Sequence, residues 1–255
     1  IEEHEADDLY LTSAGFEERA LTATDSLDSG YKADWGIIYV NYEYFDLVNR
    51  KETKKHVEML QERLSNHCEN VDVVKGSWLN AGQQITELRE GLSVLSEKES
   101  LQMTVDVTSF NRESMMVAFN ILYSFTNKVE TRILYTSPEE YGDWLSKGYR
   151  MVRNIMGFGG VQDSSKPTLL IILSGFEESR AINTIEAIEP AKLLVGEGNP
   201  PTKEPFLEKN VSHQDLAYSR QDTEGFEFPA DNIEGAYLRI SELLSKYSGP
   251  YNVIV

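Results

Sequence analysis

Short apolar segments alternate with amphipathic segments along the first half of the chain, and this alternation constrains the fold more than any other feature. Five apolar segments have the length and content of strands, at residues 9–12, 35–42, 71–74, 101–107 and 131–135. Four segments with helical periodicity separate them, at residues 17–27, 50–66, 80–95 and 113–125. Strands that alternate with helices form parallel βαβ units. The pattern therefore predicts a parallel sheet of the Rossmann type, with helices on both faces.

The chain then repeats itself. The string Gly-Phe-Glu-Glu occurs at residues 15–18 and again at residues 175–178, each time after a predicted strand. An identical string in the same structural position indicates an internal duplication. Further apolar segments predict the strands of a second copy, at residues 168–173, 191–195, 226–228 and 252–255, with a helix at 231–247. We therefore expect an α/β protein of two tandem Rossmann-like units.

The expected boundaries follow from this repeat. The first unit spans residues 1–157 and includes a helical extension at 139–156. Residues 158–167 contain two Gly, two Ser and a Pro and predict a linker. The second unit spans residues 168–255 and stops at its fourth strand. Since the chain also lacks an initial Met, we expect the natural protein to be longer.

Composition excludes several classes of function. The chain holds 24 Lys and Arg against 42 Asp and Glu, a formal charge of −18 that repels nucleic acid polymers. Cys68 is the only cysteine, so no intrachain disulfide forms. The acidic N-terminus is unlike a secretion signal, and no apolar segment is long enough to span a membrane. We expect a cytoplasmic protein without direct DNA or membrane binding.

A ligand site is expected where the strand order of the first sheet reverses. With the order 3-2-1-4-5, that position lies between the carboxyl ends of the first and fourth strands. The loops there lead into helix N-termini, which favour bound anions. The candidate ligand-binding residues are Ser13, Gly15, Phe16 and Arg19 after the first strand, and Asp106, Thr108, Ser109, Asn111 and Arg112 after the fourth.

Several of these residues also have purely structural interpretations. Thr108 or Ser109 would cap the helix that begins near Asn111. Phe16 would be a packing residue that sets the angle of the following helix. Glu17 and Glu18 favour a helix N-terminus, but their charges would repel a phosphate.

The fourth-strand segment carries a family resemblance. Residues 101–115 read Leu-Gln-Met-Thr-Val-Asp-Val-Thr-Ser-Phe-Asn-Arg-Glu-Ser-Met. This segment resembles the motif of the CRISPR-associated Rossmann fold (CARF) family, in which a strand is followed by Asp-x-Thr, a Gly-rich turn and a Lys. Asp106 and Thr108 match that motif, Arg112 replaces the Lys, and Ser109 and Phe110 replace the glycines.

The tandem arrangement is similar to that of the related SAVED domains. The resemblance implies a sensor of a cyclic or linear oligonucleotide in a prokaryotic antiviral defence system. It carries over Asp106, Thr108, Ser109 and Arg112 as ligand-binding residues. It also implies that an effector protein or a second copy of the chain is a possible partner, and that cleavage of the ligand is possible.

Two other functions remain open. In a nucleotide hydrolase or N-glycosidase, Glu17, Glu18 and Asp106 would supply acid–base chemistry, with Ser109 a weaker candidate as nucleophile. No Ser-His-Asp spacing supports that nucleophile, and all four histidines fall outside the predicted site loops.

In a ligand-free interaction scaffold, the acidic surface and the aromatic residues Tyr39, Tyr42, Tyr44 and Phe45 would contact a partner. The sequence contains no Walker-type loop, no Gly-x-Gly-x-x-Gly run and no zinc motif, so we expect no cofactor and no metal.

Overall fold

The computed structural model describes residues 6–47, 49–138, 151–175, 177–201, 212–216 and 222–255. The chain divides into two compact units. The first carries strands β1 to β5 together with residues 155–159, and the second carries strands β6 to β9. Each unit is described by itself below.

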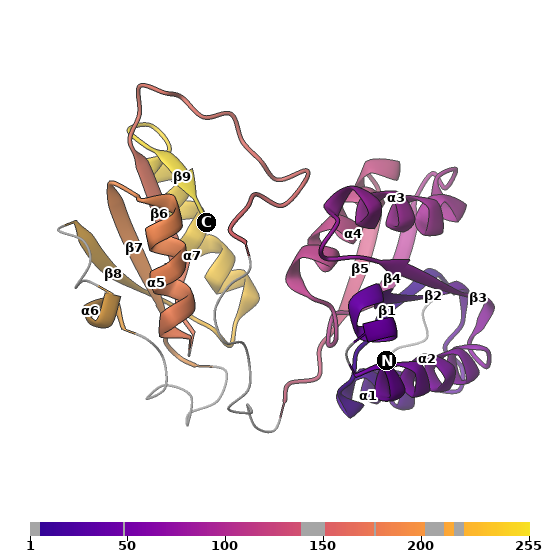
Figure 1. The fold of residues 1–255 in the computed structure, drawn as a ribbon. Coiled ribbons are helices and arrows are strands. Elements are labelled where there is room, and N and C mark those ends of the chain that lie inside the picture. Colours follow the sequence, from indigo (N-terminus) through magenta and orange to yellow (C-terminus); the bar gives the residue numbers. More distant parts are fainter. Residues whose placement is uncertain (1–5, 48, 139–150, 176, 202–211, 217–221) are drawn as a thin grey trace. The chain divides into compact units, whose positions relative to one another are not determined.

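The first unit is built on a five-stranded parallel sheet (Figure 1). Its strands are β1 (Asp7–Ala14), β2 (Ala33–Asn41), β3 (Cys68–Gly76), β4 (Leu101–Asp106) and β5 (Val129–Leu134). They lie in the order β3-β2-β1-β4-β5, with Leu11 of β1 paired to Ile37 of β2 and to Val105 of β4. The predicted α/β class and strand order are confirmed. The strand order reverses between β1 and β4: β2 and β3 are added on one side of β1, and β4 and β5 on the other.

Helices cover both faces of this sheet, as Figure 1 shows. The longer helices are α2 (Arg50–Leu64), α3 (Ala81–Leu92) and α4 (Arg112–Phe125), with a short η3 (Ser93–Leu95) after α3 and a π-helical turn η2 (Glu43–Leu47) before α2. Alternate residues of β1 point to opposite faces. Leu9 and Leu11 pack with α3 and α4, whereas Tyr10 packs with α2.

The helix predicted at residues 17–27 is shorter than expected. The structure has a 3-10 turn, η1 (Glu18–Leu21), followed by α1 (Thr22–Asp25). The Thr24 hydroxyl donates to the Leu21 carbonyl at 2.8 Å and the Ser26 hydroxyl to the Thr22 carbonyl at 2.9 Å. Hydroxyl side chains that bond to the local backbone compete with a regular helix, which explains why this segment stays short.

The second unit repeats the arrangement of the first. Its strands β6 (Thr168–Leu173), β7 (Lys192–Gly198), β8 (Thr223–Phe228) and β9 (Asn252–Ile254) are all parallel, in the order β8-β7-β6-β9. This is the order of the first four strands of the first unit. Helices α5 (Glu178–Ile188), α6 (His213–Leu216) and α7 (Ile233–Tyr247) connect them. The tandem Rossmann-like organisation is therefore confirmed.

The helical extension predicted at residues 139–156 is not found in its described part. Residues 151–156 contain no helix, and residues 139–150 lie outside the described residues. Ile155 packs against the core of the first unit, and Gly157 has a φ of 91° that ends any regular helix. Residues 160–167 contain neither a helix nor a strand.

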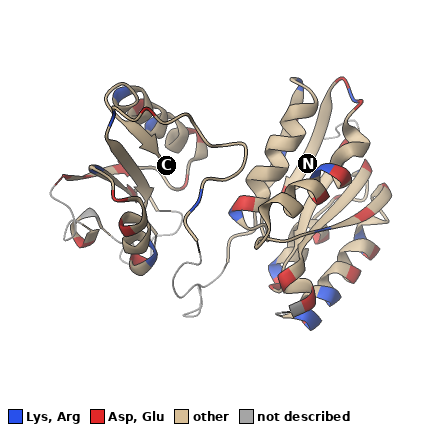
Figure 2. Ribbon diagram, turned by 45° about the horizontal axis from the view of Figure 1, so that its top comes forward, with Lys and Arg blue, Asp and Glu red and all other residues tan. Residues whose placement is uncertain are grey.

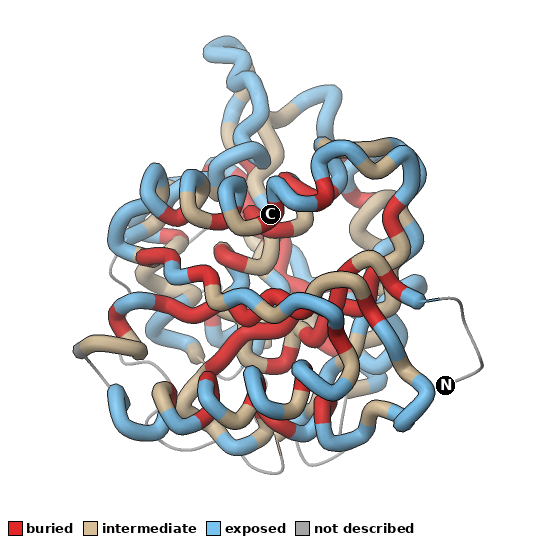
Figure 3. The backbone as a smooth tube through the Cα atoms, turned by 90° about the vertical axis from the view of Figure 1, so that its right-hand side faces the viewer, coloured by how far each residue is buried: buried red, intermediate tan, exposed pale blue. Residues whose placement is uncertain are grey.

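Buried residues lie mainly in the strands, and charged residues lie mainly on the helices and loops. The strands hold most of the buried residues, and the outer turns of the helices are exposed (Figure 3). Acidic and basic residues are interspersed on the helices and loops of both units (Figure 2). In this view, the acidic residues of each unit lie on several helices and loops rather than on a single element.

Candidate functional site

The loops that follow β1 and β4 contact each other at the carboxyl edge of the first sheet. A Cβ atom built on Gly15 would lie 3.2 Å from the Ser109 Cβ and 3.3 Å from its Oγ. A larger residue at position 15 would therefore push against Ser109. The absence of a side chain here lets the two loops approach closely, at the position where parallel α/β sheets bind ligands.

Ser13 places a buried hydroxyl just below this contact. The residue is 1% exposed, and its Oγ has no hydrogen-bond partner among the described residues. Ser13 shares its face of β1 with Leu9 and Leu11, which pack against α4. The hydroxyl therefore lies on the side of the sheet from which α4 begins, and it retains its capacity to donate one hydrogen bond.

Asp106 organises the loop after β4. Its Oδ1 accepts a hydrogen bond from the Thr108 backbone N–H at 3.0 Å, and its Oδ2 accepts one from the Thr12 hydroxyl at 3.3 Å. The side chain is buried, and this burial raises the pKa of the Asp106 carboxyl, although the hydrogen bonds oppose the shift. Asp106 therefore holds the loop after β4 in place and ties it to β1.

Thr108 and Arg19 tie these loops to the end of β5. The Thr108 hydroxyl accepts a hydrogen bond from the Thr136 backbone N–H at 2.9 Å. Arg19 donates to the Thr136 carbonyl at 3.1 Å and forms an ion pair with Glu17. The positive charge of Arg19 is therefore already balanced, and so is the negative charge of Glu17 that would otherwise repel an anion.

The cap of α4 is Asn111, not Thr108 or Ser109 as the alternative interpretation expected. Its Oδ1 accepts a hydrogen bond from the Ser114 backbone N–H at 2.7 Å, and its Nδ2 donates to Asn41 Oδ1 at 3.1 Å. An Asn cap satisfies a helix N–H group that would otherwise lack a partner. Ser109 is half-buried and is not needed for capping.

Arg112 differs from the other charged residues of the site. It is the first residue of α4 and is exposed. Its guanidinium forms no hydrogen bond or ion pair with any residue in the described part of the chain. It is therefore an uncompensated cation at the N-terminus of a 14-residue helix, the end that carries the positive partial charge of the helix dipole.

Aromatic residues fill the space beside the loops. Phe16 packs edge-on against Tyr44 at 5.3 Å between ring centroids, and Tyr44 packs against Trp78 at 4.5 Å. Glu43 is buried and accepts a hydrogen bond from the Ser77 hydroxyl. These contacts join the loops after β1, β2 and β3 and show that Phe16 has a packing role.

The aromatic segment proposed for a scaffold is only partly exposed. Tyr39 is fully buried, and its ring stacks on Phe110 with 5.6 Å between centroids. Tyr42 is 46% exposed, and the ring of Phe45 lies beneath the ammonium group of Lys75. This segment therefore does not form a continuous exposed aromatic surface.

One histidine contacts the site from outside the site loops. His56 of α2 is buried, and its Nδ1 lies 2.8 Å from the Gly15 carbonyl oxygen. Because a carbonyl oxygen only accepts, Nδ1 carries the proton and holds the Gly15 loop against α2. Thr53, one turn earlier, is fully buried with no partner for its hydroxyl among the described residues. In the sequence, the two polar residues Thr53 and His56 on the otherwise apolar face of this helix are the pattern that could have indicated a buried polar contact.

A buried polar network below α4 was also not anticipated. Gln84 of α3 is fully buried, and its Nε2 donates to the Tyr39 hydroxyl at 3.0 Å and contacts the Ser114 hydroxyl. The Ser114 hydroxyl donates to the Tyr39 hydroxyl at 3.1 Å. Burial raises the pKa of Tyr39, so the phenol stays protonated in this network. These bonds fix the start of α4 relative to α3 and β2.

Comparison with known proteins does not add a family to this geometry. No protein-family model matches the chain, and no curated protein matches it. Within the described residues, no group of three or more His, Cys, Asp or Glu side chains is placed to hold a metal ion. In the same part of the chain, no helix has both the length and the apolar content needed to cross a membrane.

Proposed function

We propose that the first unit binds a small phosphate-bearing ligand, a nucleotide or a cyclic or linear oligonucleotide, where the loops after β1 and β4 meet. The observation that carries the proposal is Arg112, an exposed cation at the N-terminus of α4 that forms no ion pair with any described residue and follows Ser109, the residue in contact with Gly15, by three positions. A guanidinium and free helix N–H groups are the donors that bind phosphate in proteins.

The proposal divides the candidate residues by role. Ser109 and Arg112 are assigned to contact the ligand, because their side chains form no hydrogen bond with any described residue. Gly15 lets the two loops approach, although its carbonyl already accepts from His56, and Ser13 adds a buried hydroxyl that has no partner among the described residues. The other candidates form the frame, since their side chains already bond or pack within the protein: Phe16, Arg19, Asp106, Thr108 and Asn111. The net charge of −18 does not prevent binding, because salt screens charges beyond ~10 Å.

In this proposal the chain is a sensor module of a prokaryotic antiviral defence system, as the resemblance to CARF and SAVED domains implies. The enzyme alternative has less support. Glu17 is paired with Arg19, and Asp106 is only 1% exposed and accepts hydrogen bonds from Thr108 and Thr12 within the protein.

The test is to identify the ligand and then to remove the guanidinium of Arg112 that is proposed to contact it. The protein is purified under mild conditions and denatured, and released nucleotides are sought by mass spectrometry. A thermal-shift screen with cyclic and linear oligonucleotides follows. Arg112→Ala should abolish any shift, whereas Arg89→Ala, at an exposed arginine of α3, should leave it unchanged. A shift that survives in Arg112→Ala, or no ligand in either experiment, would refute the proposed site.

A further inference from the structure

The outer edge of β3 is open along a nine-residue strand. β3 is the last strand in the order β3-β2-β1-β4-β5 and pairs only with β2 among the described strands. Half of the N–H and C=O groups of such a strand point away from the sheet and remain able to pair with another chain.

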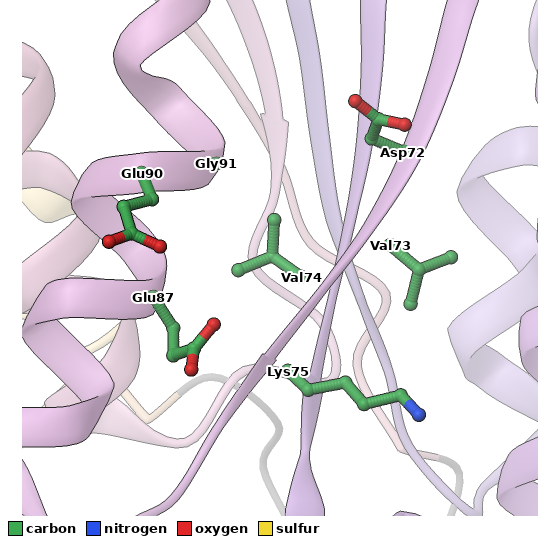
Figure 4. Close-up of a pocket in the computed structure, with 7 residues that line it drawn as sticks. All are labelled: Asp72, Val73, Val74, Lys75, Glu87, Glu90 and Gly91. Carbon is green, nitrogen blue, oxygen red and sulfur yellow. The ribbon is translucent and has the colours of Figure 1, made fainter.

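A groove runs beside this edge, between β3 and α3. Figure 4 shows the residues that line it, which are Asp72, Val73, Val74 and Lys75 from the strand and Glu87, Glu90 and Gly91 from the helix. α3 lies very close to the strand at Gly91, where an added Cβ would be 2.2 Å from Val74 Cγ2. Because Gly91 has no side chain, α3 can pack closely against β3 at Val74.

The groove is acidic and its charges are not neutralised. Asp72, Glu87 and Glu90 form no ion pair with any residue that the structure describes. Lys75 extends away from α3, as Figure 4 shows, and its Nζ lies 4.1 Å from the centre of the Phe45 ring. The one basic residue of the groove is therefore directed to the opposite face of the strand.

We propose that this edge binds an extended basic peptide segment of a partner protein, which adds a strand to β3. In an added strand, every second side chain faces α3, so Lys or Arg at alternate positions would meet Asp72, Glu87 and Glu90. Hydrogen bonds to the backbone of β3 would supply affinity that does not depend on side chains. A second copy of the chain is a poor occupant, because pairing two such edges would bring like charges together.

The proposal is independent of the ligand site at β1 and β4. It is tested with the full chain and a fluorescein-labelled peptide, Gly-Lys-Val-Lys-Val-Lys-Gly, by fluorescence polarisation. A second peptide with Pro in place of both Val residues keeps the charge but loses backbone donors and cannot pair as a strand. The first peptide should bind, and the Pro peptide should bind much more weakly.

Matched variants separate the groove from the general negative charge of the protein. The groove variant neutralises its three acids: Asp72→Asn, Glu87→Gln and Glu90→Gln. The control neutralises three exposed acids elsewhere: Glu58→Gln, Glu62→Gln and Glu97→Gln. Both variants lose the same charge. The groove variant should weaken binding about tenfold, the sum expected for three exposed ion pairs, and the control should not.

Hydrogen–deuterium exchange supplies the readout for strand pairing. Bound peptide should slow exchange of the outward-facing amides of β3 and leave those of β5 unchanged. Absence of binding, equal weakening in both variants, equal binding of the Pro peptide, or binding without protection of β3 would each overturn the proposal.

Discussion

Replacing Ser13 by alanine is expected to stabilise the first unit, although Ser13 lies in its core. The side chain is 1% exposed, and its hydroxyl has no hydrogen-bond partner among the described residues. Burial without a partner costs a hydroxyl group about 1–3 kcal/mol. The variant loses little packing, because alanine lacks only the oxygen atom. We expect a net gain of ~1 kcal/mol in the free energy of unfolding.

Ser114→Ala is the matched control, because it makes the same chemical change at a site that is also buried. The Ser114 hydroxyl donates to the Tyr39 hydroxyl at 3.1 Å and contacts Gln84 Nε2. Without this hydroxyl, the buried Gln84 amide loses one of its hydrogen-bond partners. Its Oε1 already has no partner among the described residues. We expect this variant to lose about 2 kcal/mol of stability.

The assay is urea denaturation followed by tryptophan fluorescence, with the melting temperature as a second measure. A gain of ~1 kcal/mol corresponds to a rise of about 3 °C for a domain of this size. If the ligand contacts Ser13, the variant should also show a smaller ligand-induced thermal shift than the unmodified protein. A loss of stability in Ser13→Ala comparable to that of Ser114→Ala would show that the Ser13 hydroxyl is bonded, and would refute the reasoning.

Two further predictions concern packing and pH. Gly91→Ala should lower the free energy of unfolding of the first unit by about 2 kcal/mol, although alanine has the better helix propensity, because the added Cβ would lie 2.2 Å from Val74 Cγ2. In a Val74→Ala background, urea denaturation should show that the same substitution leaves the free energy of unfolding almost unchanged. Burial raises the pKa of Asp106, so the folded state loses stability as pH rises through that pKa. Asp106→Asn should therefore melt above the unmodified protein at pH 7, and this difference should vanish below pH ~4; the opposite order at pH 7 would contradict the assignment.

Local pattern determined the architecture of this protein. The alternation of apolar and amphipathic segments predicted every strand of the first sheet, and the strand at residues 168–173 was predicted with its observed bounds. The observed strand order is the one expected for a Rossmann-like sheet, right-handed crossovers predicted helices on both of its faces, and the repeated string at residues 15–18 and 175–178 indicated the second unit. These features depend on side-chain periodicity and backbone handedness, which short stretches of sequence carry.

Only the tertiary structure decided what each site residue does. Arg19 and Arg112 are equivalent in the sequence argument, but the fold pairs Arg19 with Glu17 and Thr136 and leaves Arg112 uncompensated. His56 reaches the Gly15 carbonyl although 41 positions separate them. The acidic groove likewise combines residues of β3 and α3. Such contacts depend on how closely and at what angle a helix packs on the sheet, and that is set by the whole core rather than by any local pattern.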